Sequence, residues 1–459
     1  MKGFLIAGPA SGVGKTTTSL ALCAALRARG LTVQAFKCGP DFLDTGHLSA
    51  VTGRPARNLD GWMLDEAAIG KVFAHATTDA DIAIVEGMMG LFDGISGQGD
   101  RGSTAEIAEW LSLPVILVLD ASKSARSIAA VLRGFEVFDP ALRFTGVVLN
   151  GVAGESHYRM LGDAIRSTSP TPLLGWLPRD ESVRIPERHL GLRTAQEEPE
   201  WDQKTEAFAA LAEKQLALDE LLRSTPDLPA ELYREQRPAI SARVSIGVAQ
   251  DRAFCFYYQD NLDLLERAGA KIVPFSPLRD AHLPKGIDAL YLGGGYPEIH
   301  APQLSANTSL AAEIRAFAQE GRPIYAECGG MMYLSEQLRR GDGQVFPMTG
   351  VLPVEIEMTN RLVRFGYVEV ELMRDCLLGT KGTALRGHSF HYSRSTANRE
   401  LPEAFHARYT LSDKNEVEGV VFRNVLASYI HLHFGGAPSM AAAFVNATEE
   451  IAHSIAEAR

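Results

Sequence analysis

A glycine-rich segment close to the N-terminus has the residues and spacing of a phosphate-binding loop. Residues 8–17 read Gly-Pro-Ala-Ser-Gly-Val-Gly-Lys-Thr-Thr, after a short apolar run and before a run with helical periodicity. In such a unit, backbone N–H groups and the positive end of the helix face an anion. Lys15 would then reach the outer phosphates of a nucleotide, and the Thr16 hydroxyl would bind Mg²⁺. The nucleotide-binding residues predicted from this segment are Ser11, Gly12, Gly14, Lys15, Thr16 and Thr17.

Charged and amide side chains also follow later apolar runs, each of which has the length of a buried strand. Lys37 and Asp41 follow the second run of the chain, Glu86 ends the third, and Asn150 ends a later one. Parallel sheets bind ligands where their strands end, so we expect these side chains near the loop. Asp41 and Glu86 would hold Mg²⁺ with Thr16, Lys37 would neutralise phosphate, and Asn150 would contact an adenine edge. A helix cap for Asp41 and a turn for Asn150 are the structural alternatives.

A second chemical centre is predicted around Cys328. An apolar run is followed by Glu-Cys-Gly-Gly and a helix-like run, which is the pattern of a nucleophile elbow. A tight turn exposes the sulfur, and the N-terminus of the next helix favours the thiolate. Thiol acyl transfer also needs a base, either His431 or His433, and oxyanion donors, for which we predict Gly294 and Gly295. A buried structural cysteine is the commoner role of a lone Cys, and the elbow glycines argue against it here.

Two α/β domains are needed to position these residues. Strand-like and helix-like runs alternate over residues 1–193, which predicts a doubly wound parallel sheet. Residues 194–242 lose that rhythm and have prolines after one helical run at 204–222, so we interpret them as a linker with a helix. A new strand then opens a second α/β domain over residues 243–459. A chain of 459 residues is too long for one ordinary core, which agrees with this division.

Composition and charge exclude several classes of protein. The formal net charge of −11 argues against nucleic acid as a partner. No apolar run approaches the roughly 20 residues that cross a bilayer, and the N-terminus has no leader pattern, so we expect a cytoplasmic protein without a membrane partner. Five cysteines without metal-ligand spacing fit a reducing compartment. A local basic cluster, which includes Arg179, Arg188 and His189, could either receive an anionic substrate or form a solvated edge.

Blocks along essentially the whole chain carry a resemblance to a known family. They include Phe36-Lys37-Cys38-Gly39-Pro40-Asp41, Val85-Glu86-Gly87-Met88-Met89-Gly90, Gly293-Gly294-Gly295-Tyr296-Pro297-Glu298, Glu327-Cys328-Gly329-Gly330, Gly387-His388-Ser389-Phe390-His391-Tyr392-Ser393 and His431-Leu432-His433-Phe434. The chain resembles the cobyrinic acid a,c-diamide synthases of cobalamin biosynthesis, including the hydrogenobyrinic acid a,c-diamide synthases. Their order of domains is a dethiobiotin-synthetase-like P-loop domain and then a class I glutamine amidotransferase domain. The loop has Pro9 where the usual motif has glycine, and Gly8 stands one residue earlier. Such a stretched loop is typical of that P-loop branch.

The resemblance implies a carbon–nitrogen ligase that takes its nitrogen from glutamine. The second domain would hydrolyse glutamine through a glutamyl thioester on Cys328, and the first would phosphorylate a carboxylate of the corrin ring. Ammonia would then displace phosphate, and the a and c carboxylates would be amidated in turn. The implied cofactors are ATP and Mg²⁺, and the implied partners are glutamine and a polycarboxylate corrinoid. A homo-oligomer is compatible with the sequence.

One position departs from the amidotransferase pattern. Standard members carry His-Pro-Glu, with the orienting carboxylate two residues after the base. In this chain that position is His433, so the usual carboxylate is missing. The base is therefore either His431 or His433.

Three other functions remain open at this point. An amidotransferase that acts on other corrin carboxylates, or on nickel sirohydrochlorin, would carry the same motifs. A P-loop switch ATPase with an inactive amidotransferase-like module usually has an extra lysine where this loop has Gly8 and Pro9, and it has no use for a nucleophile elbow. A ligase with an inactive amidotransferase domain would take free ammonia as its nitrogen source.

Overall fold

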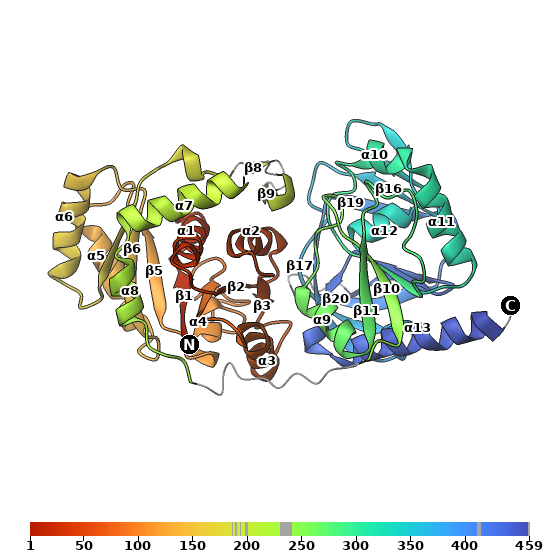
Figure 1. The fold of residues 1–459 in the computed structure, drawn as a ribbon, viewed down its shortest axis with the longest axis horizontal. Coiled ribbons are helices and arrows are strands. Elements are labelled where there is room, and N and C mark those ends of the chain that lie inside the picture. The colour runs from red at the N-terminus through yellow and green to blue at the C-terminus, as the bar shows by residue number, and fades with distance from the viewer. Residues whose placement is uncertain are drawn as a thin grey trace. The chain divides into compact units, whose positions relative to one another are not determined.

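The chain divides into two units, Met1–Arg237 and Pro238–Arg459 (Figure 1). Each unit has its own hydrophobic core. The structure is a computed structural model. It describes residues 1–185, 187–188, 191–192, 194–197, 201–229, 241–410 and 415–457.

A seven-stranded sheet forms the middle of the first unit, with the strand order β3-β2-β4-β1-β5-β6-β7. Every pair of neighbouring strands in it is parallel. Its strands are apolar runs because a parallel sheet is covered on both faces. The strands are β1 Lys2–Ala7, β2 Val33–Cys38, β3 Arg57–Leu59, β4 Ile82–Glu86, β5 Val115–Asp120, β6 Phe144–Asn150 and β7 Leu173–Leu177; a separate pair is β8 Glu187–Arg188 and β9 Gly191–Leu192.

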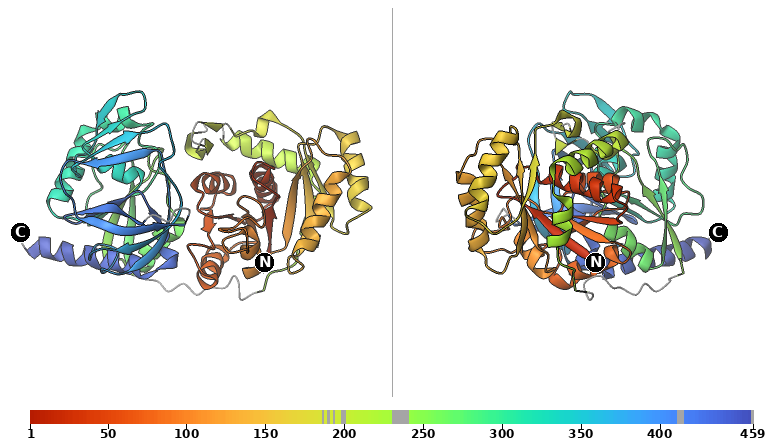
Figure 2. Two further views of the ribbon diagram at one scale, coloured as in Figure 1. Left: turned by 180° about the vertical axis from the view of Figure 1, so that it is seen from behind. Right: turned by 60° about the vertical axis from the view of Figure 1, so that its left-hand side comes forward.

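Helices cover both faces of this sheet (Figure 1, Figure 2). Side chains alternate along β5, so Ile116 and Val118 pack in the core around α1, whereas Leu117 and Leu119 pack with α5 and α6. This arrangement confirms the predicted doubly wound sheet. The helices are α1 Lys15–Ala28, α2 Phe42–Thr52, α3 Glu66–Thr77, α4 Thr104–Trp110, α5 Ser127–Phe138, α6 Glu155–Arg166, α7 Trp201–Gln215 and α8 Leu218–Ser224, with 3₁₀ turns η1 Glu181–Val183 and η2 Ala195–Glu197.

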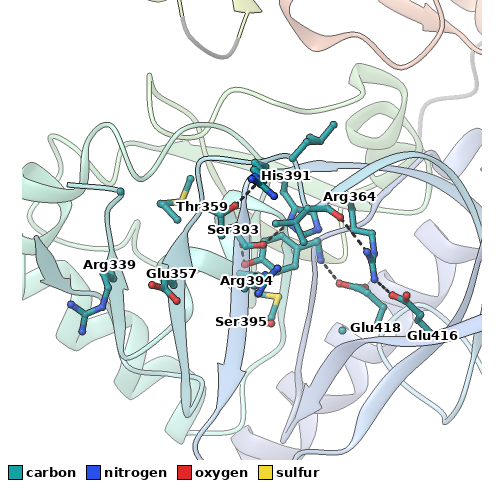
Figure 3. A pocket seen from close by; sticks show the side chains of 18 of the residues that line it. Arg339, Glu357, Thr359, Arg364, His391, Ser393, Arg394, Ser395, Glu416 and Glu418 are labelled. Carbon is teal, nitrogen blue, oxygen red and sulfur yellow. Dashed lines mark hydrogen bonds and ion pairs between the residues drawn. The ribbon is translucent and has the colours of Figure 1, made fainter. Parts of the chain in front are cut away.

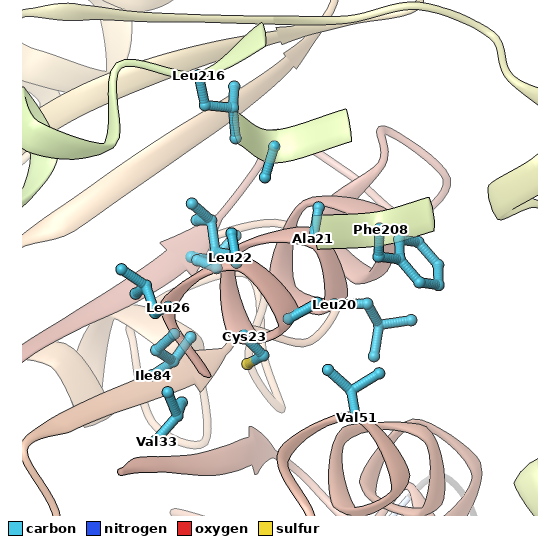
Figure 4. Packing of buried hydrophobic residues seen from close by; sticks show 14 of the residues in the cluster. Leu20, Ala21, Leu22, Cys23, Leu26, Val33, Val51, Ile84, Phe208 and Leu216 are labelled. Atoms are coloured by element: carbon cyan, nitrogen blue, oxygen red, sulfur yellow. The ribbon is translucent and has the colours of Figure 1, made fainter. Parts of the chain in front are cut away.

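Helix α1 is buried at the centre of the first core (Figure 4). Leu20, Leu22 and Leu26 pack with Val33 of β2 and Ile84 of β4, and all five side chains are almost completely buried. Burying a side chain of this size contributes roughly 1.5–3 kcal/mol. The packing therefore fixes the start of α1, where Lys15 lies, beside the ends of these strands.

Helices α7 and α8 differ from the linker expected over residues 194–242. Phe208 and Leu211 of α7 are buried in the same core as α1, together with Leu218 and Leu221 of α8 (Figure 4). An amphipathic helix has the same sequence pattern whether it joins two domains or covers one. These helices belong to the first unit, and residues 198–200 and 230–240 of the expected linker lie outside the described residues.

The second unit has a ten-stranded mixed sheet, in the order β11-β10-β12-β13-β22-β21-β20-β17-β18-β23. Neighbours from β11 to β22 are parallel, and the remaining pairs are antiparallel. The strands are β10 Val244–Ala249, β11 Ala270–Phe275, β12 Ala289–Leu292, β13 Ile324–Glu327, β17 Arg364–Leu372, β18 Ala384–His391, β20 Glu403–Tyr409, β21 Asn415–Phe422, β22 Val425–Ser428 and β23 His431–Leu432.

A smaller sheet, ordered β15-β14-β16-β19, and the remaining helices complete the second unit. Its strands are β14 Gln337–Arg339, β15 Val345–Pro347, β16 Val354–Met358 and β19 Ser393–Ala397. The helices are α9 Gln259–Arg267, α10 Ala301–Ala306, α11 Thr308–Gln319, α12 Gly329–Leu334, α13 Ser439–Glu457 and the 3₁₀ turn η4 Phe434–Gly436. Among the described residues, no helix combines the length and the apolar character that crossing a membrane requires.

Candidate active sites

The phosphate-binding loop connects β1 to α1. Gly12 and Gly14 have φ angles of 79° and 101°, which favour glycine, and α1 begins directly afterwards at Lys15. Lys15 is buried, and its Nζ donates to the carbonyl oxygens of Ala10 at 2.8 Å and Met89 at 2.6 Å. The ammonium therefore joins the loop to the segment that follows β4. The predicted nucleotide-binding residues of this segment surround one helix N-terminus.

Glu86, at the end of β4, is the centre of a buried charge cluster beside this loop. Its Oε1 accepts hydrogen bonds from Thr16 Oγ1 at 2.6 Å and from Lys37 Nζ at 2.9 Å. Lys37 also forms an ion pair with Asp44 at 2.6 Å. The predicted residues Thr16, Lys37 and Glu86 meet because β1, β2 and β4 are neighbours that end at one edge of the sheet. Asp44, in the first turn of α2, joins them through this ion pair.

The other oxygen of Glu86, Oε2, is buried and has no hydrogen-bond partner among the described residues. Mg²⁺ in phosphate sites is commonly held by one or two protein carboxylates together with phosphate oxygens. An orphaned carboxylate oxygen close to the Thr16 hydroxyl fits that requirement. In the described part of the chain, no three His, Cys, Asp or Glu side chains converge into a metal cage. The donor set therefore fits Mg²⁺ shared with a nucleotide.

Asp41 caps helix α2. Its Oδ1 accepts the backbone N–H groups of Leu43 at 2.8 Å and Asp44 at 2.9 Å. Burial and the neighbouring charge of Asp44 raise the pKa of Asp41 to about 6. The structural alternative for Asp41 is therefore realised, and its part in binding Mg²⁺ stays a prediction.

The two lysines of this region differ in their electrostatics. Burial and the charge of Lys37 lower the pKa of Lys15 to about 8. Burial also acts to lower the pKa of Lys37, but Asp44 and Glu86 raise it above its ordinary value. Burial raises the pKa of Glu86 to about 6, against the effect of Lys37. Lys37 is thus a fixed cation already matched by carboxylates, whereas Lys15 would be stabilised as a cation by an incoming phosphate.

Asn150, at the end of β6, lies against the phosphate-binding loop. Its Nδ2 donates to the carbonyl oxygen of Val13 at 3.0 Å. A Cβ atom on Gly14 would lie 2.2 Å from that nitrogen, so the amide and the loop are in close contact. Asn150 therefore supports the loop, and its predicted contact with adenine stays a prediction.

Cys328 occupies the turn between β13 and α12. Its φ of 48° and ψ of −103° are strained for a residue with a side chain. Gly330 admits no side chain, because a Cβ atom there would lie 2.1 Å from the carbonyl oxygen of Leu292. The N–H of Cys328 donates to the carbonyl oxygen of Ser428 at 2.7 Å, which joins the turn to β22. This strand–turn–helix arrangement is that of a nucleophile elbow.

His431 brings an imidazole to Cys328. A hydrogen bond joins the two side chains, and a Cβ atom on Gly294 would lie 2.3 Å from Cε1 of the ring. Burial acts to lower the pKa of His431, but its interactions with Cys328 and with the carboxylate of Glu327 raise it to about 10. The ring of His431 therefore keeps its proton at neutral pH, beside the sulfur of Cys328.

His433, the other candidate base, has a local structural role. Its Nδ1 accepts the N–H of Gly435 at 3.1 Å at the start of η4, and its ring centroid lies 4.7 Å from that of Tyr258. Of the two histidines, His431 is the one with a described interaction with Cys328.

The two predicted oxyanion glycines are not equivalent. The N–H of Gly294 donates to the carbonyl oxygen of Phe256 at 3.2 Å, which differs from the role predicted for it. The nitrogen of Gly295 lies 3.1 Å from where a Cβ atom on Gly329 would stand, and so beside the elbow. The oxyanion role of Gly295 stays a prediction. The N–H of Gly329 is a second candidate that the residue patterns could have indicated, because an elbow places the next N–H at the oxyanion.

The second unit has a cavity of about 1170 Å³, which His391 and Ser393 line (Figure 3). Met331 of α12, three residues after Cys328, also lines it. His391 stacks on Tyr429 with ring centroids 3.9 Å apart, and its Nδ1 lies 2.9 Å from the carbonyl oxygen of Ser393. That contact places a proton on Nδ1 and leaves Nε2 as an acceptor. Burial lowers the pKa of His391 to about 4, so the ring is neutral. His391 belongs to a motif noted in the sequence without an assigned role.

Known protein families match both units. A CobQ/CobB/MinD/ParA nucleotide binding domain matches residues 4–192, and a CobB/CobQ-like glutamine amidotransferase domain matches residues 245–439. A protein of Syntrophotalea carbinolica named cobyrinate a,c-diamide synthase is 46% identical over 96% of this chain and 97% of its own. Proteins of the same name from Dehalococcoides mccartyi and Salmonella typhimurium are each 43% identical, over 97% and 95% of this chain and 98% and 96% of theirs. The chain belongs to the cobyrinate a,c-diamide synthase family.

Membership of the cobyrinate a,c-diamide synthase family confirms the resemblance found in the sequence. The structure describes the predicted substrate-binding group only in part. Arg179 is exposed after β7, the side chain of Arg188 is not described, and His189 lies outside the described residues. A substrate-binding role for this basic cluster stays a prediction for this member of the family.

Proposed function

We propose that this protein uses ATP and glutamine to amidate the a and c carboxylates of cobyrinic or hydrogenobyrinic acid. The observation that carries the proposal is that one chain combines the Lys15–Glu86 region with the Cys328–His431 pair. Full-length similarity to proteins named cobyrinate a,c-diamide synthase supports the substrate. A carboxylate is a poor electrophile toward ammonia, so one centre must activate it while the other releases the nitrogen.

In the second unit, the Cys328 sulfur attacks the carboxamide carbon of glutamine. The His431 imidazolium gives its proton to the departing nitrogen, so ammonia leaves and a glutamyl thioester remains. The neutral imidazole then takes a proton from water, whose oxygen attacks the thioester. Glutamate leaves and the thiolate returns. The N–H groups of Gly295 and Gly329 stabilise the oxyanion that forms in both steps.

In the first unit, the chain positions the phosphates and the acceptor carboxylate. Lys15 would exchange the carbonyl oxygens of Ala10 and Met89 for phosphate oxygens, and Thr16 and Glu86 would hold Mg²⁺. When bound, Mg²⁺ neutralises charge on the transferred phosphoryl group. A corrinoid carboxylate oxygen takes the phosphoryl group from ATP, and ADP leaves. Ammonia then attacks the acyl phosphate carbon, phosphate leaves, and an amide remains.

Mass spectrometry of the corrinoid product tests this function. Cobyrinic and hydrogenobyrinic acid are incubated with the protein, Mg²⁺, ATP and glutamine labelled with ¹⁵N in the amide. We expect two labelled amides per corrinoid, with ADP and glutamate formed alongside. Labelled amides at other carboxylates would assign the protein a different substrate position, and no amide on either acid would refute the proposal.

Cys328→Ala separates the two centres in the same assay. The variant should lose amidation with glutamine, because the nucleophile is gone, and keep amidation with ammonium chloride within about twofold of wild type. Cys23→Ala is the matched control, since Cys23 is buried in the first core and should leave both activities intact. A folded Cys328→Ala protein that loses both activities would contradict the division of labour.

A further inference from the structure

Glu327, the last residue of β13, is a buried carboxylate directly before Cys328. It is 1% exposed. Its Oε2 lies 3.8 Å from Nδ1 of His431, which is an ion-pairing distance. Because Cys328 interacts with the same imidazole, the ring has a carboxylate on one side and the thiol on the other.

Three donors from three strands hold this carboxylate in place. The hydroxyl of Tyr291 donates to Oε2 at 3.0 Å, and the hydroxyl of Tyr325 donates to Oε1 at 2.5 Å. The backbone N–H of Leu432, next to His431, donates to Oε1 at 3.1 Å. A carboxylate fixed by hydrogen bonds can in turn fix the tautomer and the orientation of a neighbouring imidazole.

The position that carries the orienting carboxylate in other class I amidotransferases has no acid here. His433 stands there, and its Nδ1 is engaged with the N–H of Gly435. We propose that Glu327 is the positioning residue of the amidotransferase centre, binding Nδ1–H of His431 and directing Nε2 toward Cys328. This inference rests on the proposed function, because it concerns how the glutamine-hydrolysing centre is oriented.

The arrangement moves the orienting acid from the loop of the base to the strand of the nucleophile. Glu327 and Cys328 are consecutive, so the acid and the thiol are tied together by one peptide bond. The hydrogen bond from Leu432 adds a second link, from the acid to the backbone beside the base. The relative positions of acid, base and nucleophile then depend on the pairing of β13 with β22 and on the short segment to β23.

The test uses the full-length protein and measures glutamine hydrolysis. Glu327→Gln keeps the size of the side chain and removes its charge. We expect kcat for glutamine hydrolysis to fall by about 10²-fold or more, with KM for glutamine changed by less than about threefold. Amidation with ammonium chloride should stay within about twofold of wild type, because it does not use His431. Glu327→Asp, which restores a carboxylate, should recover at least about tenfold over Glu327→Gln.

A double variant distinguishes positioning from a structural role. If Glu327 acts through His431, adding Glu327→Gln to His431→Ala changes the residual hydrolysis rate by less than about twofold. If the rate losses of the two single variants multiply in the double variant, the inference is overturned. A Glu327→Gln variant with the kcat of wild type would overturn it as well. Inactivity of the wild-type protein toward glutamine would instead refute the proposed function.

A measurement on the wild-type protein covers the case in which Glu327→Gln does not fold. In the ¹H–¹⁵N spectrum of ¹⁵N-histidine-labelled protein, His431→Ala identifies the signal of the His431 ring. A hydrogen bond to Glu327 shifts its Nδ1–H proton downfield of the ring protons of the exposed His453. A proton on Nε2 alone, or an Nδ1–H at the position of an exposed histidine, would overturn the inference.

Discussion

Two buried glutamates end strands β4 and β13, and their surroundings differ. Glu86 uses one oxygen for Lys37 and Thr16, and its other oxygen has no hydrogen-bond partner among the described residues. Glu327 accepts a tyrosine hydroxyl on each oxygen and a backbone N–H as well. Glu86 is therefore open to a cation, whereas Glu327 is closed and its charge acts on the ring beside it.

The contrast shows that the position of an acid at a strand end does not determine its chemistry. Both carboxylates are almost completely buried, at 0% and 1% exposure, so neighbouring groups must stabilise the buried negative charge of each. The ammonium group of Lys37 stabilises the charge of Glu86 through Oε1 and leaves Oε2 for a metal ion. Neutral hydroxyls compensate Glu327 and leave its charge available to the imidazolium of His431. The hydrogen-bond donors around each glutamate, rather than the residue type, therefore determine its chemical role.

The largest effect is expected at the open glutamate. Glu86→Gln removes the charge that would hold Mg²⁺, so amidation should fall by about 10³-fold or more with either glutamine or ammonium chloride as the nitrogen source. Rates measured over a range of MgCl₂ concentrations should also show a higher Mg²⁺ requirement than wild type.

Glu136→Gln is the matched control for this variant. Glu136 is largely buried on α5 and accepts hydrogen bonds from Ser169, Thr171 and Arg133, away from the phosphate-binding loop. The amidation rate of Glu136→Gln should lie within about twofold of the wild-type rate. The comparison of the two glutamates breaks down if Glu86→Gln loses only the activity that depends on glutamine.

The next largest effect is expected from removing the cation of the open cluster. Lys37→Met leaves the buried carboxylates of Asp44 and Glu86 without their counter-charge. The free energy of unfolding of the first unit should fall by about 3 kcal/mol, as for other broken buried ion pairs. Urea unfolding at neutral pH measures this change in the free energy of unfolding, and Arg166→Met is the control variant.

Arg166 pairs with Asp163 on the surface of α6, and both side chains are more than half exposed. Removing an exposed pair of this kind costs less than about 1 kcal/mol. Equal losses in Lys37→Met and Arg166→Met would show that the Glu86 cluster tolerates an unmatched charge, and the open glutamate would then need no cation.

A smaller effect is expected where a glycine gives room to the imidazole of the closed centre. A Cβ atom on Gly294 would lie 2.3 Å from Cε1 of His431. Gly294→Ala should displace the ring and lower kcat for glutamine hydrolysis by about 10²-fold, while amidation with ammonium chloride is kept. Gly134→Ala on α5, where a Cβ atom would meet no atom within 4 Å, is the control. Equal rates in the two variants would show that the ring position is not decisive.

Much of the open cluster could be predicted from the sequence, because its geometry follows from one local rule. Parallel neighbours end at the same edge, so Lys37 and Glu86 had to approach the loop that carries Lys15 and Thr16. The nucleophile-elbow pattern likewise indicated Cys328, and it left the base open between His431 and His433. In each case the chemistry could be inferred from a residue type at the end of a strand or from a motif.

The residues that the sequence did not reveal depend on long-range pairing. Glu327 meets His431 through the pairing of β13 with β22 and the hydrogen bond to Leu432, more than one hundred positions away. Nothing in the pattern of a strand-end glutamate predicts such a partner. A related reason applies to helix α7, because its apolar stripe of Phe208 and Leu211 packs with α1, which lies far away in sequence. Asn150 similarly supports a loop that is far away in sequence.

The smallest effect concerns how the stability of the second unit depends on pH through His391. Burial lowers the pKa of His391 to about 4, below the ordinary value near 6.5 that it regains on unfolding. Between these values the unfolded chain binds a proton that the folded chain does not, so stability falls as pH falls. At pH 5 this proton uptake lowers the free energy of unfolding of the second unit by about 2 kcal/mol relative to neutral pH.

His391→Phe should reduce the difference in unfolding free energy between pH 7.5 and pH 5 by about that amount. His453→Gln, at an exposed position on α13, controls for the loss of a histidine as such. Urea unfolding at the two pH values measures the difference, and an unchanged difference in His391→Phe would mean that the ring beside Tyr429 is protonated within the fold.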